Sequence, residues 1–303
     1  MPQLPPGPLT IQYEMKSVLL SLLAAAALTS SLHAQTSVWK VTQGDSVLYL
    51  GGTCHVLRPS DLPLPPEYDQ AYAAAKTVVF ETDLARMQSP EMQQVVMQRG
   101  MFTDGTTLEQ ALSPEAWTAL QKYCEQRQFP IDQLRPMRPW LLTVMLAVIE
   151  LQKLGVSQQG ADSIYFQRAK ADAKGIGELE TFERQVDYIT GMAGDRPSEL
   201  VLNSLADLDQ LPKEFPELIA AWRKGDLATL EQLMNRDLRE KYPELHQKLL
   251  VERNNAWLPV IEKLLATPDV EFVLAGVGHM SGPEGIVARL RERGCKVEQV
   301  TAA

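Results

Sequence analysis

Strand-like runs lie near both ends of this chain, and a long stretch of mostly helical sequence separates them. The helical stretch extends from about residue 91 to residue 265, whereas the runs before and after it are short and apolar. Short apolar runs bounded by turn residues are typical of β-strands, and longer stretches with helical spacing are typical of α-helices. The pattern therefore predicts an α/β fold with one mixed central β-sheet, built from N- and C-terminal segments, and a large helical middle region.

The expected strands are short runs rich in valine, leucine and aromatic residues. They lie at residues 38–41, 47–52, 77–81, 270–275 and 295–300, with a further candidate at 175–182. A Gln-Gly-Asp-Ser turn favours a hairpin between the first two strands. Ser113 before Pro114 favours the start of a helix. Gly225 before Asp226 indicates that one helix ends there and another begins.

The first residues are typical of a secretory signal. Met15 and Lys16 precede an apolar run at residues 18–28, and a small residue, Ala34, ends the following stretch. Such a run is too short to cross a bilayer comfortably. We therefore assign residues 1–34 to an upstream extension plus signal peptide, and residues 35–303 to one domain. Met1 and Met15 are both open as the translation start.

We expect the mature chain to be exported, either to the periplasm of a Gram-negative bacterium or into the medium. No second apolar run approaches membrane-spanning length, so we expect no membrane span after signal cleavage. The formal net charge is −9, and no block of lysine and arginine stands out. Phosphate binding needs a concentrated basic surface, so nucleic acid is excluded as an expected partner.

Two of the four histidines share one local setting, a Gly-x-x-His turn that follows an apolar strand-like run. His55 follows Gly52, and His279 follows Gly276. Glycine lets the backbone turn sharply and lets a ligand approach the main chain. A histidine just beyond a strand end lies where open sheets usually place their sites. Either turn alone is a weak signal, because a single histidine near a turn is more often structural.

Glu81 is the third chemically suggestive residue, because it ends an apolar run. A carboxylate there is costly to bury unless it is paired, hydrogen-bonded or bound to a metal. If the strand ends converge, His55, Glu81 and His279 could be the ligands of a divalent metal such as Mn²⁺, Co²⁺ or Zn²⁺. The metal would lower the pKa of a bound water molecule to about 7 and polarise a substrate carbonyl.

Three segments together resemble the TraB/GumN family, which includes the Tiki proteins. They are VWKVTQGDSVLYLGGTCHVL, VVFETDL and FVLAGVGHMSGPEGIVARLRERGCKV, and the resemblance extends from Val38 to Val300. Tiki-like members are described as metal-dependent proteases that use two Gly-x-x-His motifs and a glutamate. This implies a catalytic and metal-binding role for His55, Glu81 and His279. In more distant erythromycin esterase-like relatives, histidine and glutamate are thought to act without a required metal. Cys54 departs from the aliphatic residue that is usual there.

Other residues within the resemblance are weaker predictions. Arg138, Glu180 and Arg253 could bind substrate, because an arginine can hold a carboxylate or stabilise an oxyanion. The alternative for these three residues is a salt bridge between packed helices. The remaining polar residues and tryptophans are expected to be structural: Asp162 and Gln185 as structural positions, His246 as a solvated residue on a polar helix face, and Trp140, Trp222 and Trp257 as core residues.

The leading hypothesis is an exported hydrolase that cleaves a peptide or related acyl bond with a metal-bound water molecule. Glu81 would be either a ligand or the general base. The first alternative is a metal-free, esterase-like enzyme in which a histidine abstracts the proton. The second is a non-catalytic periplasmic protein that binds a metal, haem or a small ligand. We expect a peptide or small acyl substrate, while the oligomeric state is left open.

Overall fold

The computed structural model describes residues 36–157 and 159–301. The chain divides into two units, Met1–Ala34 and Gln35–Ala303, and the description concerns the second unit by itself. The expected signal peptide and its cleavage after Ala34 lie outside the described residues. Within the described part, no helix combines the length and the apolar character that a membrane span requires.

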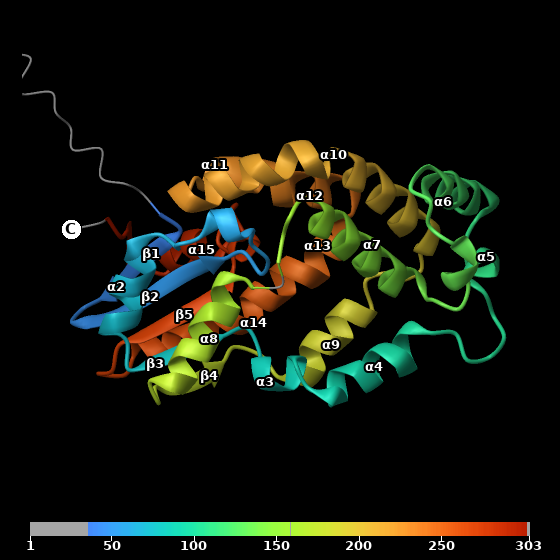
Figure 1. The fold of residues 1–303 in the computed structure, drawn as a ribbon. Helices are drawn as coiled ribbons and strands as arrows, with labels where there is room; N and C mark the ends of the chain where they lie inside the picture. Colours follow the sequence, from blue (N-terminus) through green and yellow to red (C-terminus); the bar gives the residue numbers. More distant parts are fainter. Residues whose placement is uncertain (1–35, 158, 302–303) are drawn as a thin grey trace, which may run out of the picture. The chain divides into compact units, whose positions relative to one another are not determined.

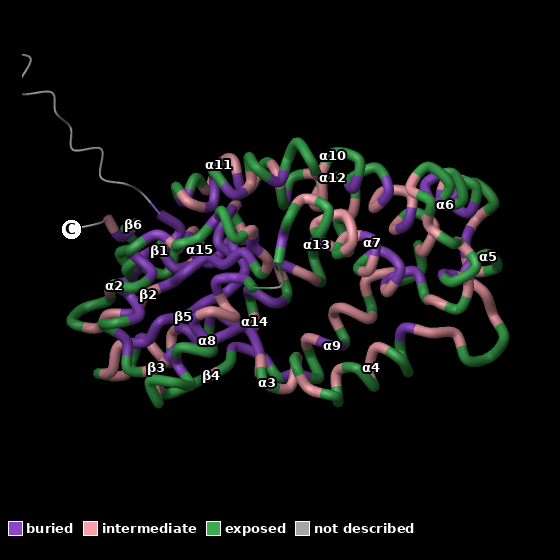
Figure 2. The backbone as a smooth tube through the Cα atoms, in the orientation of Figure 1, coloured by how far each residue is buried: buried purple, intermediate pink, exposed green. Residues whose placement is uncertain are grey.

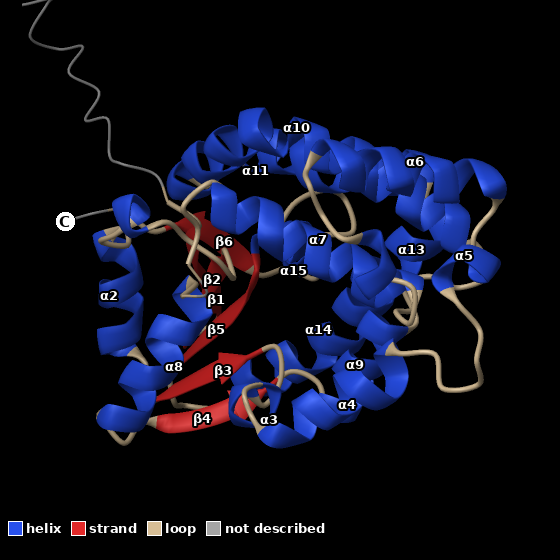
Figure 3. Ribbon diagram, turned by 45° about the vertical axis from the view of Figure 1, so that its right-hand side comes forward, coloured by secondary structure: helices blue, strands red, loops and turns tan. Residues whose placement is uncertain are grey.

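A six-stranded mixed sheet forms one part of the second unit (Figures 1 and 3). Its strands, in sheet order, are β4 (Gly175–Glu178), β3 (Thr77–Phe80), β5 (Glu271–Gly276), β2 (Ser46–Thr53), β1 (Val38–Gln43) and β6 (Lys296–Gln299). β4, β3, β5 and β2 are parallel neighbours, whereas β1 is antiparallel to both β2 and β6. The predicted fold class is therefore confirmed, including the further strand inside the helical stretch.

All helices of the described residues lie along the chain between β2 and β6. In chain order they are η1 (Pro59–Asp61), α2 (Pro66–Ala74), α3 (Leu84–Met87), α4 (Pro90–Gly100), α5 (Leu108–Ala111), α6 (Pro114–Gln126), η2 (Ile131–Gln133), α7 (Pro139–Lys153), α8 (Ala161–Ala171), α9 (Phe182–Thr190), α10 (Pro197–Lys224), α11 (Leu227–Leu230), η3 (Glu231–Arg236), α12 (Asp237–Lys241), α13 (Pro243–His246), η4 (Gln247–Val251), α14 (Glu252–Leu265), η5 (Val277–His279) and α15 (Ile286–Glu292). η3 and η4 are π-helical turns.

Local sequence explains several of these limits. The Ser113 hydroxyl accepts a hydrogen bond from the backbone N–H of Ala116 and caps α6, as the sequence predicts. Gly225 ends α10 with φ of +62°, a left-handed conformation that glycine adopts without steric cost. The Asp226 carboxylate then accepts from the backbone of Thr229 and caps α11. These caps fix where α6 begins, where α10 ends and where α11 begins.

The central strands are buried, and β5 is buried along its whole length, whereas the edge strand β4 is mostly exposed (Figure 2). Alternate residues of a strand point to opposite faces of the sheet. Val38 belongs to a core cluster that includes residues of α2, α8 and α10, and its neighbour Trp39 belongs to a second cluster with residues of α14 and α15. Phe272 and Val273 of β5 divide between the same two clusters. A third cluster joins α5, α6, α7 and the first half of α10, away from the sheet.

The register of the sheet decides which turns meet. Thr53 at the end of β2 pairs with Gly276 at the end of β5, and these strands are parallel. Val79 of β3 pairs with Val273 of β5, so β3 ends at the same edge. The two Gly-x-x-His turns and the residue after β3 therefore leave the sheet side by side, at the edge where parallel sheets place ligand sites.

Candidate functional site

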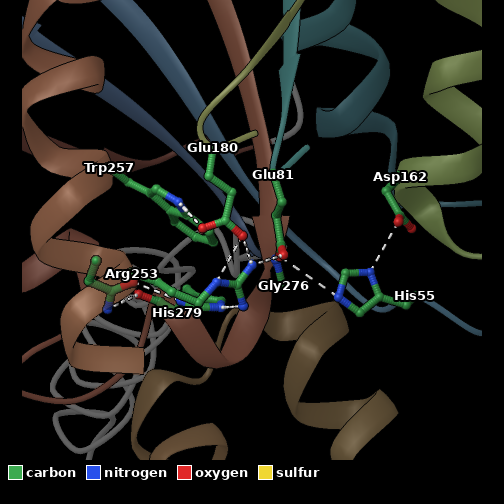
Figure 4. A network of polar contacts seen from close by, with 9 residues as sticks. His55, Glu81, Asp162, Glu180, Arg253, Trp257, Gly276 and His279 are labelled. Carbon is green, nitrogen blue, oxygen red and sulfur yellow. Dashed lines mark hydrogen bonds and ion pairs between the residues drawn. The ribbon is translucent and has the colours of Figure 1, made fainter. Parts of the chain in front are cut away.

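The structure brings His55, Glu81 and His279 together at this edge of the sheet (Figure 4). Glu81 follows β3 directly and lies between the two Gly-x-x-His turns, with its side chain 7% exposed. Its Oε1 accepts a hydrogen bond of 2.6 Å from the backbone N–H of Gly276, and its Oε2 accepts one of 2.7 Å from Arg253. Burial raises the pKa of Glu81, but the charges of Arg253 and His55 and the hydrogen bond from Gly276 outweigh burial and lower it to about 2. Glu81 is therefore a carboxylate.

His55 is held between two carboxylates. Its Nδ1 lies 3.0 Å from Oδ2 of Asp162, and its Nε2 lies 3.8 Å from Oε1 of Glu81. A carboxylate only accepts hydrogen bonds, so Nδ1 is the donor to Asp162 and Nε2 faces the site. Partial desolvation of its ring lowers the pKa of His55, but the carboxylates of Asp162 and Glu81 outweigh this effect and raise the pKa to about 9. The side chain is 57% exposed, so a ligand can reach it.

The start of α8 holds Asp162 in this position. The backbone N–H of Ala161 donates to the carbonyl of Cys54 at 3.0 Å, so the helix start lies against the turn that carries His55. Gly160 makes this approach possible, because a Cβ at that position would lie 2.2 Å from the carbonyl carbon of His55. Asp162 was interpreted from the sequence as a structural position, and the structure instead places its carboxylate on His55.

His279 is buried and neutral. Asn254 donates its Nδ2 hydrogens to the backbone carbonyls of His279 and Glu284, at 3.4 and 2.9 Å, so its Oδ1 is the acceptor. This oxygen lies 2.7 Å from Nδ1 of His279, which therefore carries the proton. Nε2 of His279 is left as an acceptor for Nη1 of Arg253 at 3.1 Å. Burial lowers the pKa of His279 to about 3.

Arg253 joins the site's acidic groups and His279. Its guanidinium donates to Glu180 at 3.0 and 2.7 Å, to Glu81 at 2.7 Å and to His279 at 3.1 Å. The guanidinium carbon of Arg253 lies 4.5 Å from the centroid of the Trp257 ring. The ring N–H of Trp257 donates to Glu180 at 3.1 Å. A guanidinium has five N–H donors, and these bonds use four of them. One hydrogen on Nη1 is left, on a group that lines a pocket.

The three expected metal ligands do not fit a cation as they stand. Arg253 donates hydrogen bonds to Oε2 of Glu81 and to Nε2 of His279. Its guanidinium therefore lies where a metal would have to bind these two groups. Among residues 36–157 and 159–301, no group of three His, Cys, Asp or Glu side chains is arranged to hold a metal ion. His55 and Glu81 alone, 3.8 Å apart, could share one ligand between them.

The motif glycines act by leaving space. A Cβ on Gly276 would lie 3.2 Å from both Oε1 of Glu81 and Nε2 of His55, in the gap between these two groups. A Cβ on Gly52 would lie 2.8 Å from the side chain of Val277, in the turn that precedes His279. Gly276 therefore keeps the gap between Glu81 and His55 open, and Gly52 lets the two turns pack together.

The other expected residues separate into two groups. Glu180 and Arg253 belong to the site and form the buried ion pair described above. Arg138 does not contact this ion pair, because it is exposed and lines a different pocket with Trp140 and Thr190. Its guanidinium carbon lies 4.7 Å from the centroid of the Phe102 ring. The interpretation of His246 as solvated is wrong, because this residue is only 6% exposed and burial lowers its pKa.

Two pockets open beside His55 and share Thr53 and His55. One, of about 260 Å³, is also lined by Glu81, Thr82, Asp162 and Gln185. Four buried oxygens of its lining residues have no hydrogen-bond partner, on Thr53, Thr82, Asp162 and Gln185. Buried polar groups without a protein partner usually bind ordered water. The other pocket, of about 370 Å³, reaches Arg253, Gly276 and His279 and has mainly apolar walls.

Sequence reasoning missed Asp162, Asn254 and Trp257 as parts of the site. Asp162 follows a glycine at the start of a helix, and Asn254 follows Arg253 directly, but neither position marks a contact with histidine. Trp257 was expected in the core, and it is fully buried there. Its ring nevertheless packs against His279, with the ring centroids 4.4 Å apart, and its N–H holds Glu180.

A family model described as TraB/PrgY/gumN matches residues 37–299. The match covers both Gly-x-x-His turns, Glu81 and the helices that carry Asp162 and Arg253. No curated protein and no solved structure matches the chain.

Proposed function

This chain belongs to the TraB/PrgY/gumN family, and we propose that it hydrolyses an ester or amide bond of an acyl substrate, with His55 as the general base. The observation that carries the proposal is the pair of contacts made by His55. One ring nitrogen binds Asp162, and the other faces Glu81 and the open pockets. A histidine held in this way by a carboxylate is the usual arrangement for proton transfer in hydrolases.

Asp162 fixes the tautomer of His55. Because Nδ1–H is directed at the carboxylate, a neutral His55 presents the lone pair of Nε2 to the pocket. Nε2 and the Glu81 carboxylate are 3.8 Å apart, so one water molecule can hydrogen-bond to both. The unpartnered oxygens beside the polar pocket favour water there as well. Water is therefore the attacking nucleophile in this proposal.

The reaction needs a donor for the oxyanion that forms when water attacks a carbonyl group. Arg253 has one remaining N–H, and Glu81, Glu180 and His279 hold its guanidinium in place. A preorganised cationic donor of this kind is well suited to stabilise developing negative charge. Arg253 is therefore proposed to bind substrate, and Glu180 acts through Arg253 as a positioning residue.

The steps balance without another reactant. His55 accepts a proton from water as the water oxygen bonds to the carbonyl carbon, and the carbonyl oxygen becomes an oxyanion beside Arg253. The oxyanion then collapses, the bond to the leaving alcohol or amine breaks, and the leaving group takes the proton from His55. The products are a carboxylic acid and an alcohol or amine.

A divalent cation is the second mechanistic candidate. His55 and Glu81 lie close enough to share one, and the site contains more acidic than basic groups. His279 could join only if Arg253 moved away from it. Elemental analysis of protein purified without chelators, followed by assay after EDTA treatment and after addition of Mn²⁺, Co²⁺ or Zn²⁺, decides between the two. Stoichiometric metal with activity that EDTA abolishes would replace the metal-free proposal.

The proposal is tested by a screen of chromogenic esters and aminoacyl amides. Wild type is expected to hydrolyse at least one substrate, and His55→Gln is expected to lose most of that activity. His246→Gln is the matched control, because His246 lies outside the site. Thermal unfolding of all three proteins checks that they fold. If wild type hydrolyses nothing, or His55→Gln and His246→Gln are equally active, then catalysis by His55 is wrong and the non-catalytic binding protein gains support.

Export to the periplasm or the medium is part of the same proposal, and the first residues of the chain support it. Fractionation of cells that express the full chain tests it. Mature protein that begins at Gln35 in the periplasmic or secreted fraction is the expected result, as measured by N-terminal sequencing. Full-length protein retained in the cytoplasm would contradict it.

A further inference from the structure

The apolar pocket beside His55 has walls from several helices and a floor of reacting groups. Phe215 and Leu218 come from α10, Met234 from η3, Leu238 from α12, and Leu249 and Leu250 from η4. His55, Arg253 and His279 are the residues of its lining that carry or can carry charge, and all three belong to the proposed site. Its volume of about 370 Å³ is at the lower end of the range for small-molecule pockets.

Two π-helical turns form part of this wall. η3 supplies Met234 and η4 supplies Leu249, and both turns lie in a long helical stretch that is otherwise mainly α-helical. π-helical turns are rare and occur frequently at functional sites, because they redirect side chains at the cost of regular hydrogen bonds. Two of them on one pocket indicate that the wall is shaped for a ligand and not simply closed over the core.

The wall is also tied directly to the turn that carries His279. Asn235 of η3 donates to the backbone carbonyl of Gly278 at 2.8 Å. A Cβ on Gly278 would lie 3.2 Å from the terminal methyl of Met234, so the wall and the turn are in close contact. Met234 is 37% exposed, and methionine adapts its shape to apolar ligands. A group bound in this pocket therefore lies beside the reacting residues.

We propose that this pocket binds the apolar acyl chain of the substrate, so that the enzyme prefers esters or amides of carboxylic acids several methylenes long. The inference rests on the proposed function, because it places the acyl carbonyl between His55 and Arg253. The occupant is apolar because the wall offers no charged partner away from the floor. The polar pocket on the other side of His55 is left for water and the leaving group.

The test is a series of p-nitrophenyl esters from acetate to octanoate. We expect kcat/KM to rise about fourfold per added methylene until the pocket is full, the equivalent of about 0.8 kcal/mol per buried CH₂. Leu218→Glu places a charge in the wall and is expected to abolish the rise of kcat/KM with acyl-chain length. Val148→Glu is the matched control, because Val148 is an exposed residue of α7 outside the pocket, and it is expected to keep the slope.

A binding measurement keeps this inference separate from the proposed reaction. Acetamide, butanamide and octanamide are titrated into His55→Gln protein by calorimetry, and the same fourfold step in Kd per methylene is expected. Leu218→Ala provides a milder second variant if Leu218→Glu fails to fold. Graded binding without hydrolysis of any ester would support the pocket and contradict the proposed reaction. The pocket assignment would be overturned if kcat/KM did not depend on acyl-chain length. It would also be overturned if neither kcat/KM nor Kd changed with chain length.

Discussion

Asp162→Asn is the substitution that tests the site most directly, because it removes one negative charge and nearly preserves shape. With its pKa at about 9, His55 of the wild type is deprotonated in only about 1% of molecules at pH 7. The rate kcat/KM should therefore rise tenfold per pH unit from pH 7 and level off above pH 9. The Asn variant loses the main charge that raises this pKa, so its midpoint should move down towards the ordinary value of 6.5.

Two effects of the substitution oppose each other, and pH separates them. The lower pKa deprotonates His55 and raises the rate at pH 7 by up to about 75-fold. Loss of the carboxylate that holds the tautomer lowers the rate at every pH, by up to about 10⁴-fold in comparable hydrolases. The loss of kcat/KM relative to wild type should therefore be much smaller at pH 7 than at pH 10.

The measurements are pH–rate profiles and an NMR titration of the imidazole signals, with His55 assigned by its absence in His55→Gln. Asp172→Asn, at the other end of α8, is the control. It should leave the midpoint of the pH–rate profile and the midpoint of the His55 NMR titration unchanged. The NMR titration does not depend on catalysis. An unchanged His55 midpoint in Asp162→Asn, or an equal loss of rate at every pH, would refute the role given to this contact.

Three further predictions concern the same region. Gly276→Ala should fold, because φ of −49° suits alanine, but its methyl group lies 3.2 Å from Glu81 and His55, so hydrolysis should fall at least tenfold in steady-state assays. Gly160→Ala should lower the free energy of unfolding, measured in urea, by about 1–3 kcal/mol, because its Cβ meets backbone atoms of His55; an unchanged midpoint would contradict this. The pKa of His279 is lowered to about 3, so the folded state loses stability as pH falls below 6.5. The pKa of His55 is raised to about 9, so the folded state loses stability as pH rises from 6.5 towards 9. Urea unfolding should therefore show greatest stability near pH 6.5, and His55→Gln should abolish only the alkaline decline; a decline that stays in this variant would count against the assignment.

The strands could be predicted from the sequence because short apolar runs indicate them. The meeting of the three site residues could be predicted because each residue follows such a run. Apolar runs marked the strands, and parallel strands that end together bring their turns together. The family resemblance is confirmed by the match over residues 37–299. The metal stays a prediction, and the contacts of Arg253 give it a specific competitor at the site.

The contacts that orient the site could not be predicted, because they depend on how helices pack. Nothing near Asp162 in the sequence indicates that it would meet a residue more than a hundred positions earlier. Arg138 and Arg253 looked equivalent as helix-associated arginines, yet only Arg253 faces Glu81. His246 lies among polar residues, and its burial results from packing that periodicity does not report.

The order of strands has a consequence for when the proposed site can form during synthesis. β5 lies between β2 and β3, although it follows both of them by almost two hundred residues or more along the chain. Until a ribosome has released that late segment, β2 and β3 have no common neighbour, and His55 and Glu81 cannot be aligned. An incomplete chain therefore cannot align His55 with Glu81, and the proposed site is complete only when β5 lies between β2 and β3.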